Sequence, residues 1–259
     1  MIIVADYTGV WLKGKGRLTI FRTKQGRAGF ASVPRYVLVM ENALVIGATG
    51  GIGRAVVADL QARGVAVTTL GRVDGLDVTE PGSVDRVLGA MDGPFDPIFV
   101  AIGILAVPGD APKKTLGAVT AGAMAGVFAV NAIGPALILR HAGRLLRKDG
   151  CGVVAVLSAR VGSIGDNRMG GWYSYRASKA ALNQIVHGAA VELGRSHRHS
   201  VVVALHPGTV ATAFTANYAG KHPTVTPDVA AAHLLGVLDG LTVADSGGFF
   251  DWAGETVRW

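Results

Sequence analysis

Residues 43–54 read ALVIGATGGIGR, an apolar run followed by a glycine-rich turn and the start of a helical pattern. The run at 43–46 is typical of a buried strand, and a helix is expected over about residues 52–63. Glycines between a strand and a helix let the chain turn tightly and let its backbone approach a pyrophosphate. Because the trio Gly47, Gly51 and Gly53 occupies that position, it predicts a nucleotide-binding loop, with a mere tight turn as the alternative.

Beyond this loop, short apolar runs alternate with longer helical patterns. Further strands are expected at residues 65–70, 97–101, 152–157, 201–205 and 248–252. Further helices are expected over about residues 81–91, 117–147, 174–194 and 227–238, and Gly134-Pro135 is a place where the long one can break. Such alternation indicates right-handed βαβ units. The predicted fold class is therefore α/β: a single doubly wound Rossmann domain with a parallel sheet, spanning residues 40–259.

Charge is distributed unevenly between this domain and the residues before it. The net charge is +7, of which residues 1–39 carry +6, from seven basic residues and Asp6. Residues 40–259 carry 18 basic and 17 acidic residues, or +1, so a nucleic-acid partner is not expected. Residues 1–39 are expected to be a disordered or non-native extension, with translation starting at Met40. A flexible basic arm and a targeting segment are the alternatives.

Cysteine and hydropathy patterns bear on location. The single cysteine, Cys151, cannot form an internal disulfide, which fits a reducing, cytoplasmic environment. We find no run of about 18 uninterrupted apolar residues and expect no membrane span. No spacing among the seven histidines and Cys151 suggests a metal site.

The end of the second predicted strand bears on the nucleotide. It runs into Gly71-Arg72, with no carboxylate before Asp74. A carboxylate there would bind the ribose 2′-hydroxyl of NAD, whereas a guanidinium suits the 2′-phosphate of NADP. NADP(H) is therefore favoured, and NAD(H) is not excluded. Asp77 and Val78 lie where a side chain can cap the adenine edge, although helix N-capping by Asp77 explains that residue equally well.

Tyr175 and Lys179 lie four residues apart in a predicted helix, which places them on one face. A phenol is a poor acid at its ordinary pKa near 10. A neighbouring ammonium is expected to lower the pKa of Tyr175, so that the phenol can exchange a proton with an alcohol or carbonyl oxygen. The pair thus points to hydride transfer coupled to proton transfer at oxygen.

The glycine loop, Asn131, the Tyr175/Lys179 pair and the segment Pro207-Gly208-Thr209 together resemble the short-chain dehydrogenase/reductase family in order and spacing. The resemblance covers about residues 43–212. The stretches SARVGSI at 158–164, GGWYSY at 170–175 and SGGFFDW at 246–252 are similar to the C-factor/sniffer-type carbonyl reductases of that family.

The resemblance implies roles for the matching positions. Tyr175 would be the acid/base, Lys179 would also bind the nicotinamide ribose, and Asn131 would hold a water that relays protons. A buried amide bonded to backbone is the alternative for Asn131. The implied cofactor-binding residues are Gly47, Thr49, Gly51, Ile52, Gly53, Arg72, Asp77, Val78, Ala101, Gly103, Tyr175, Lys179, Pro207, Gly208, Val210 and Thr212. For residues 207–212, a strand-end turn with a helix cap is the alternative.

Three departures from the family pattern are visible. The serine that usually polarises the substrate carbonyl aligns with Ala159, so Ser158 and Ser163 are the available hydroxyls, and Ser158 is taken as the candidate. The usual Asn-Ala-Gly reads Ala101-Ile102-Gly103, without the asparagine. The region after the 201–205 strand is short, and residues 213–226 are expected to form a small substrate lid.

The predicted activity is therefore hydride transfer between NADP(H) and a small carbonyl or alcohol substrate. A nucleotide-binding regulatory or signalling protein of low turnover is the alternative, and nucleic-acid binding through residues 1–39 is a third. The family resemblance implies a homodimer or homotetramer, in which the helices bearing Asn131 and Tyr175 pair across a two-fold axis. The sequence does not indicate which carbonyl compound is the substrate.

Overall fold

The computed structural model describes residues 13–14, 17–18, 40–216 and 223–259. The expectation for residues 1–39 falls almost wholly outside them. The exceptions are β1 (Lys13–Gly14) and β2 (Arg17–Leu18), which form a short antiparallel pair. Part of the lid expected at residues 213–226 also lies outside the described residues.

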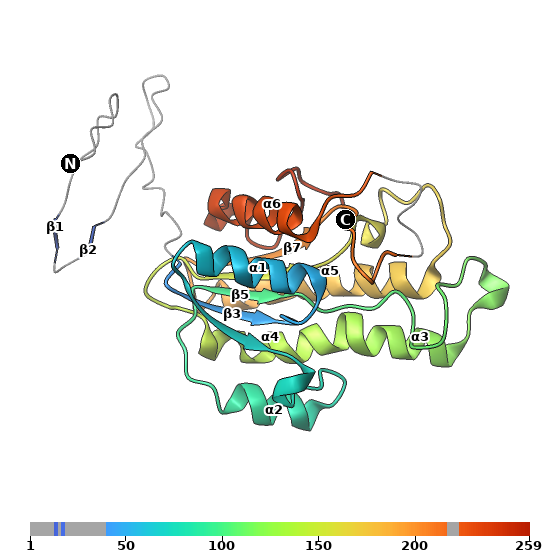
Figure 1. Cartoon of the computed structure of the whole chain (residues 1–259), viewed down its shortest axis with the longest axis horizontal. Coiled ribbons are helices and arrows are strands. Elements are labelled where there is room, and N and C mark those ends of the chain that lie inside the picture. The colour runs from blue at the N-terminus through green and yellow to red at the C-terminus, as the bar shows by residue number, and fades with distance from the viewer. Residues whose placement is uncertain (1–12, 15–16, 19–39, 217–222) are drawn as a thin grey trace, which may run out of the picture.

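The domain is built on a six-stranded parallel sheet in the order β4-β3-β5-β6-β7-β8 (Figure 1). The strands are β3 (Asn42–Ile46), β4 (Ala66–Leu70), β5 (Pro97–Val100), β6 (Val153–Leu157), β7 (Val201–His206) and β8 (Phe249–Asp251). These strands are short and mostly apolar, and the central ones are buried along their whole length. This is the expectation for a parallel sheet covered on both faces.

Helices cover both faces of the sheet. Strand side chains alternate between two cores: Val154 faces one with α4 and α5, and Val153 faces the other with α1 and α6. The helices are α1 (Gly51–Ala62), α2 (Pro81–Gly89), α3 (Ala121–Phe128), α4 (Gly134–Leu145), α5 (Tyr173–Leu193) and α6 (Pro227–Gly240). The predicted single doubly wound domain is confirmed.

The strand order places one switch point between β3 and β5. From β3 the chain passes to β4 on one side of the sheet and then to β5 on the other. A single 3₁₀ turn, Arg72–Asp74, and a short loop join β4 to α2, so β4 is the edge strand. Ligands of open α/β sheets bind at the carboxyl end of such a switch point.

The long helix expected at residues 117–147 begins later and contains an irregular turn. A 3₁₀ turn at Leu116–Ala118 precedes α3, and a π-helical turn, Ala129–Ile133, joins α3 to α4. Pro135 has no N–H to donate to the carbonyl of Asn131 four residues earlier, which explains the irregular turn at this place. The break near Gly134-Pro135 is thus present as a π turn rather than a chain reversal.

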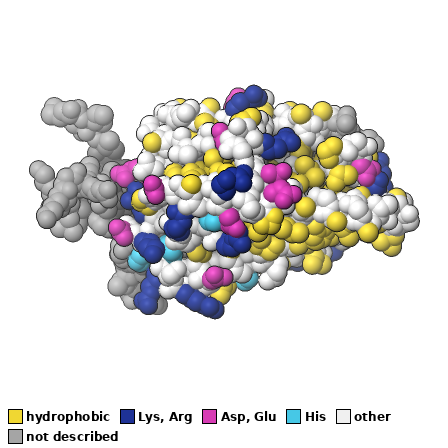
Figure 2. All heavy atoms as spheres, turned by 90° about the horizontal axis from the view of Figure 1, so that it is seen from below, with side chains coloured by type: hydrophobic (Ala, Val, Ile, Leu, Met, Phe, Trp, Pro, Cys, Tyr) yellow, Lys and Arg dark blue, Asp and Glu magenta, His cyan; other side chains and the backbone are white. Residues whose placement is uncertain are grey.

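By length and composition, the continuous helical segment Ala121–Leu145 could cross a membrane. An 18-residue window of this segment has a mean hydropathy of 1.8, and 39% of the window is buried. The expectation of no membrane span considered only uninterrupted apolar runs and missed this segment. In the fold, α4 supplies core residues such as Ile138 and Leu139, as a core helix of a globular domain does. Figure 2 shows hydrophobic side chains gathered toward the end of the molecule where α3 lies.

Candidate active site

The glycine loop is held in shape by close backbone contacts. Gly47 has φ +87°, and a Cβ on it would lie 2.5 Å from the carbonyl oxygen of Ala101 at the end of β5. A Cβ on Gly53 would lie 2.3 Å from the carbonyl oxygen of Gly47. No side chain fits at either position. These glycines therefore bring α1, β3 and β5 together at the switch point, and binding of a nucleotide by the loop stays a prediction.

The loop also meets the segment after β7. A Cβ on Gly51 would lie 2.6 Å from Cγ2 of Thr212, so these distant residues line one place. Helix α1 begins at Gly51 without a side-chain cap on its first-turn amides. Uncapped amides and the positive end of a helix suit an anion. The cradle thus fits a pyrophosphate, and Thr49, Ile52, Pro207 and Val210 belong to the two segments that form it.

The predicted nucleotide-selecting residues follow β4. Arg72 is exposed directly after the strand. The carboxylate of Asp77 accepts hydrogen bonds from the Thr79 amide at 2.9 Å and the Thr79 hydroxyl at 2.7 Å, and these bonds lower the pKa of Asp77. Val78 packs against the start of α4, since a Cβ on Gly134 would lie 3.0 Å from its side chain. Asp77 thus caps its own turn and is exposed at the site's rim.

Tyr175 and Lys179 lie on α5 and are both buried, with 6% and 3% of their surfaces exposed. The ammonium of Lys179 donates to the carbonyl oxygen of Leu157 at 2.9 Å. Among the described residues no carboxylate forms an ion pair with it. Burial lowers the pKa of Lys179 to about 7.

The expected depression of the Tyr175 pKa is not found in the structure. Burial raises the pKa of the phenol well above its ordinary value, because the phenolate would be desolvated. Lys179 does not offset this, since its own charge is destabilised by the same burial. The prediction had considered the neighbouring charge and left out the cost of desolvation.

Asn131 connects the π turn to two other parts of the site. Its side-chain oxygen accepts from the Ile104 amide at 2.8 Å, and its nitrogen donates to the Ile104 carbonyl at 2.8 Å and to the Ser178 hydroxyl at 3.0 Å. A Cβ on Gly103 would lie 3.4 Å from both the Asn131 oxygen and the Lys179 nitrogen. The side chain of Asn131 therefore bonds to backbone, as the alternative for this residue stated, and its role in holding a relay water stays a prediction.

The candidate serine hydroxyls are both engaged. Ser158 is buried and its hydroxyl donates to the side-chain oxygen of Asn183 at 2.5 Å. The hydroxyl of Ser163 accepts from the Asp166 amide at 3.0 Å. Ser158 continues the strand face that packs against α5, whereas Ala159 occupies the other face, as alternation along a strand requires. The role of Ser158 toward a substrate stays a prediction that this geometry does not support.

Two aromatic neighbours of Tyr175 were not predicted. Trp172 lies with its ring centroid 6.1 Å from that of Tyr175 in an edge-on arrangement, and Phe214 lies at the same 6.1 Å with a tilted ring. Trp172 is the non-glycine residue with positive φ among those described, at φ 50° and ψ 39°. Such a conformation costs about 1–3 kcal/mol. The aromatic Trp172 three residues before Tyr175 was the available signal in the sequence.

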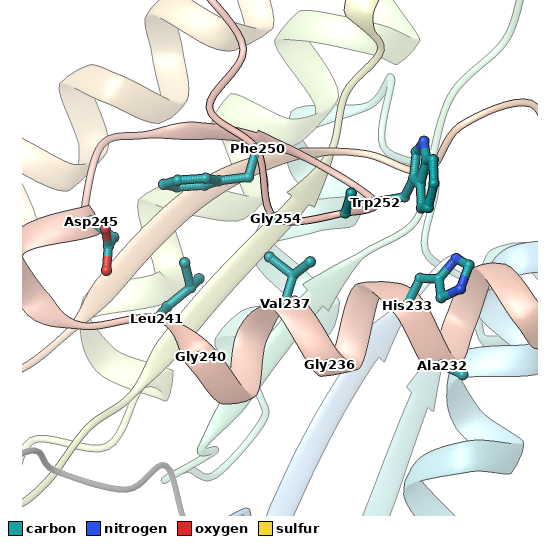
Figure 3. Close-up of a pocket in the computed structure, with 11 residues that line it drawn as sticks. Ala232, His233, Gly236, Val237, Gly240, Leu241, Asp245, Phe250, Trp252 and Gly254 are labelled. Carbon is teal, nitrogen blue, oxygen red and sulfur yellow. The ribbon is translucent and has the colours of Figure 1, made fainter. Parts of the chain in front are cut away.

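A separate hollow of about 580 Å³ lies between α6 and the chain around β8 (Figure 3). Val237 and Trp252 line it, whereas Tyr175 and Lys179 do not. The hollow is thus separate from Tyr175 and Lys179, the buried residues that the sequence predicts to be catalytic. Within the described ranges, no group of three or more potential metal-ligating His, Cys, Asp or Glu residues is gathered.

Comparison with known proteins assigns a family. The family model described as enoyl-(acyl carrier protein) reductase matches residues 72–247. Over 236 residues the chain is 32% identical to 1-hydroxy-2-glutathionyl-2-methyl-3-butene dehydrogenase of Rhodococcus sp. (strain AD45), covering 85% of this chain and 100% of that one. It is 38% identical over 144 residues to C-signal of Myxococcus xanthus, covering 56% of this chain and 83% of that one.

The fold is also similar to solved structures. A Burkholderia multivorans protein with bound NADP matches with a TM-score of 0.69 and 25% identity, covering 85% of this chain and 100% of that one. The similarity in fold, the match to the family model and the 32% identity over the whole length of the dehydrogenase agree with one another. The chain belongs to the short-chain dehydrogenase/reductase family.

Proposed function

We propose that this oxidoreductase transfers hydride between NADP(H) and a carbonyl or alcohol substrate, with Tyr175 as the acid/base. One observation carries the proposal. Lys179 is buried without a carboxylate partner within the described residues, on the same helix face as Tyr175 and next to Gly103 at the switch point. An unpaired buried cation is costly to a fold, and such groups gather at functional sites.

The residues present fit a dinucleotide. The glycine cradle and the uncapped start of α1 would hold the pyrophosphate, and exposed Arg72 would pair with the 2′-phosphate. Thr212, Gly208 and Lys179 would border the nicotinamide end. When bound, the nicotinamide supplies or accepts the hydride. The NADP in the related Burkholderia structure supports NADP(H), and an exposed Arg72 after β4 is consistent with that preference.

Burial raises the pKa of Tyr175, so the phenol carries the proton that reduction of a carbonyl needs at neutral pH. Release of that proton requires a lower pKa, and we propose that the ammonium of Lys179 supplies this lowering when nucleotide and substrate are bound. With a pKa of about 7, Lys179 can take up or release a proton near neutral pH. Pro135 removes the usual α-helical donor to the Asn131 carbonyl, which leaves that oxygen a plausible anchor for the relay water.

The direct test is an NADPH oxidation assay with a panel of aldehydes, ketones and quinones. We expect saturable turnover, and we expect Tyr175→Phe to reduce kcat by about 10²- to 10⁴-fold, as for loss of a general acid. Tyr173→Phe is the matched control, because Tyr173 lies on the same helix two residues away, and it should retain turnover. Equal activity of the Tyr175→Phe and wild-type proteins would contradict the proposal.

Nucleotide preference is tested at Arg72. Charge-assisted hydrogen bonds to phosphate contribute about 1.5–3 kcal/mol. We therefore expect Arg72→Ala to weaken NADPH binding by roughly ten- to a hundredfold and to leave NADH binding nearly unchanged, as measured by calorimetry. Arg63→Ala is the control, since Arg63 ends α1 and pairs with Asp59 and Asp239. An equal loss for both nucleotides would argue against a 2′-phosphate contact.

A regulatory protein with little turnover is the second candidate. Ala159 supplies no hydroxyl to orient a substrate, and the chain resembles C-signal over 144 residues. In the same assay, tight NADPH binding without turnover of any carbonyl would favour this candidate. Activity that depends on Tyr175 would exclude it.

We also propose that two copies pair through α4 and α5. Ile133 is half exposed, and partly buried Leu137 and Ile185 lie on these helices. Small residues such as Ala177 and Ala181 allow a second helix to approach closely. Replacement of Ile133 by Glu should shift the mass measured by light scattering from dimer to monomer. An unchanged dimer would place the interface elsewhere.

A further inference from the structure

Two aromatic side chains, those of Trp172 and Phe214, lie beside Tyr175 near the start of α5. Trp172 caps the helix, and its ring meets that of Tyr175 edge-on at a centroid distance of 6.1 Å with 65° between the planes. Phe214, in the segment after β7, approaches the same ring at 6.1 Å and 58°. The phenol that is proposed to deliver the proton thus has two other aromatic rings beside it, one at the start of its own helix and one in the segment after β7.

Neither flanking ring is buried as a core residue would be. Phe214 is 38% exposed and Trp172 is partly exposed, whereas Tyr175 is 6% exposed. The rings therefore pack against Tyr175 on one side and present apolar surface on the other. Exposed aromatic surface next to a reactive hydroxyl is suited to contact a ligand.

Positive φ angles and hydrogen bonds fix the backbone around Trp172. Gly170 and Gly171 both have positive φ, and Trp172 continues this left-handed run at φ 50°. The Arg176 guanidinium donates to the Gly170 carbonyl at 3.1 Å, and the Tyr173 amide donates to the Lys113 carbonyl at 3.3 Å. Strained conformations persist where surrounding contacts enforce them, typically at functional sites.

Among the described residues, the hydroxyls that the sequence offered for orienting a substrate are already engaged in hydrogen bonds. Position 159 is an alanine, and the hydroxyls of Ser158 and Ser163 are bonded to Asn183 and to the Asp166 amide. Orientation of the carbonyl group must then come mainly from the shape and packing of its substituents. The flat surfaces available for that packing are those of Trp172 and Phe214.

We infer that Trp172 is a specificity-determining residue that stacks on a flat aromatic substituent of the substrate, with Phe214 beside it. The substrate class is therefore an aryl ketone or the corresponding aryl carbinol. The inference rests on the proposed function. In the reduction, hydride from NADPH reaches the carbonyl carbon, the proton of Tyr175 reaches the oxygen, and NADPH is oxidised to NADP⁺.

The test compares two ketones that differ mainly in flatness, acetophenone and cyclohexyl methyl ketone. The measured quantity is the ratio of their kcat/KM values with NADPH, in the wild type and in Trp172→Gly and Trp172→Phe. Glycine removes the ring and adopts positive φ without strain, so the backbone should keep its course. Phenylalanine keeps an aromatic ring. Thermal unfolding of each variant confirms that it is folded.

Stacking between aromatic rings is worth a few-fold to about tenfold in affinity. We expect Trp172→Gly to lower the acetophenone-to-cyclohexyl ratio by about three- to tenfold, mainly through KM, and Trp172→Phe to restore most of it. An equal fall for both ketones would show a structural role and overturn the inference while leaving the proposed function intact.

Two further outcomes separate the inference from the proposed function. If the wild type reduces aliphatic aldehydes or ketones but not acetophenone, the substrate class is wrong and the oxidoreductase activity stands. If the wild type binds NADPH and reduces no carbonyl compound, the proposed function fails and the inference fails with it.

Discussion

Buried ionisable side chains at the two ends of the central sheet, where the strands begin (the amino edge) and where they end (the carboxyl edge), have different partners. At the amino edge, Asp96 is fully buried and accepts hydrogen bonds from the amides of Glu41 and Asn42 at 2.6 and 2.8 Å, and it pairs with Arg147. At the carboxyl edge, Lys179 is equally buried, and its recorded contact within the described residues is one carbonyl oxygen. The Asp96 carboxylate thus has a basic partner and two amide donors, whereas the Lys179 ammonium has no acidic partner within the described residues.

The difference separates a group that stabilises the fold from one that we propose is retained for function. Asp96 fixes the starts of β3 and β5 to the loop that bears Arg147, so its charge stabilises the fold. Burial lowers the pKa of Lys179 to about 7, and within the described residues no carboxylate forms an ion pair with its ammonium. A buried ionisable group with a shifted pKa and no charged partner is typical of a site that binds a ligand.

The largest effect that would sharpen this contrast is expected at Asp96. Asp96→Asn leaves the Arg147 guanidinium without its main carboxylate, and breaking a buried pair costs about 3 kcal/mol or more. Urea unfolding should show this loss, whereas kcat/KM per folded molecule should stay unchanged. Asp85→Asn is the control, because Asp85 is exposed and pairs with Arg140 at the surface, where such pairs contribute little to stability. A similar small effect for both variants would remove the contrast.

The pH dependence of stability tests the same contrast at Lys179. Between about pH 7 and 10 an unfolded chain keeps the Lys179 proton, whereas the cofactor-free folded protein has released it. The unfolded state then binds more protons, so the free energy of unfolding rises with pH in this window, by at most about 1.4 kcal/mol per pH unit. Above about pH 10 the raised pKa of Tyr175 acts in the other direction.

Urea unfolding of the wild type and Lys179→Met across pH 7 to 9.5 isolates this contribution. Other titrating groups, such as Cys151, whose pKa burial raises, cancel in the difference. The two profiles should diverge as pH falls toward 7, with the wild type losing stability faster. Parallel profiles would show that Lys179 keeps an ordinary pKa in the folded protein.

The fold was predictable because its decisive features are local. The glycine loop specifies a strand-to-helix turn through Gly47 and Gly53, and the apolar runs identify the buried strands. The π turn was not predicted as such, because it depends on Pro135 acting on Asn131 within a helix whose apolar pattern continues unbroken. The sheet order also required the structure, since the sequence does not say which strands lie side by side.

The site was predictable where spacing along one helix determines it. Tyr175 and Lys179 share a helix face because they are four residues apart, and both are buried; their catalytic role stays a prediction. What failed was the sign of the Tyr175 pKa shift, because desolvation depends on all surrounding segments. The bond from Ser158 to Asn183 and the approach of Phe214 to Tyr175 likewise join distant parts of the chain.

The central claim is that the fold retains buried Lys179 for the reaction and not for stability. The most direct test measures two quantities on one preparation of Lys179→Met at pH 7: the free energy of unfolding without cofactor, and kcat/KM with NADPH and a carbonyl substrate. Methionine fills similar space without a charge to bury, so stability should be equal to or above that of the wild type, while kcat/KM falls at least about a hundredfold. A large loss of stability with kcat/KM retained would contradict the account.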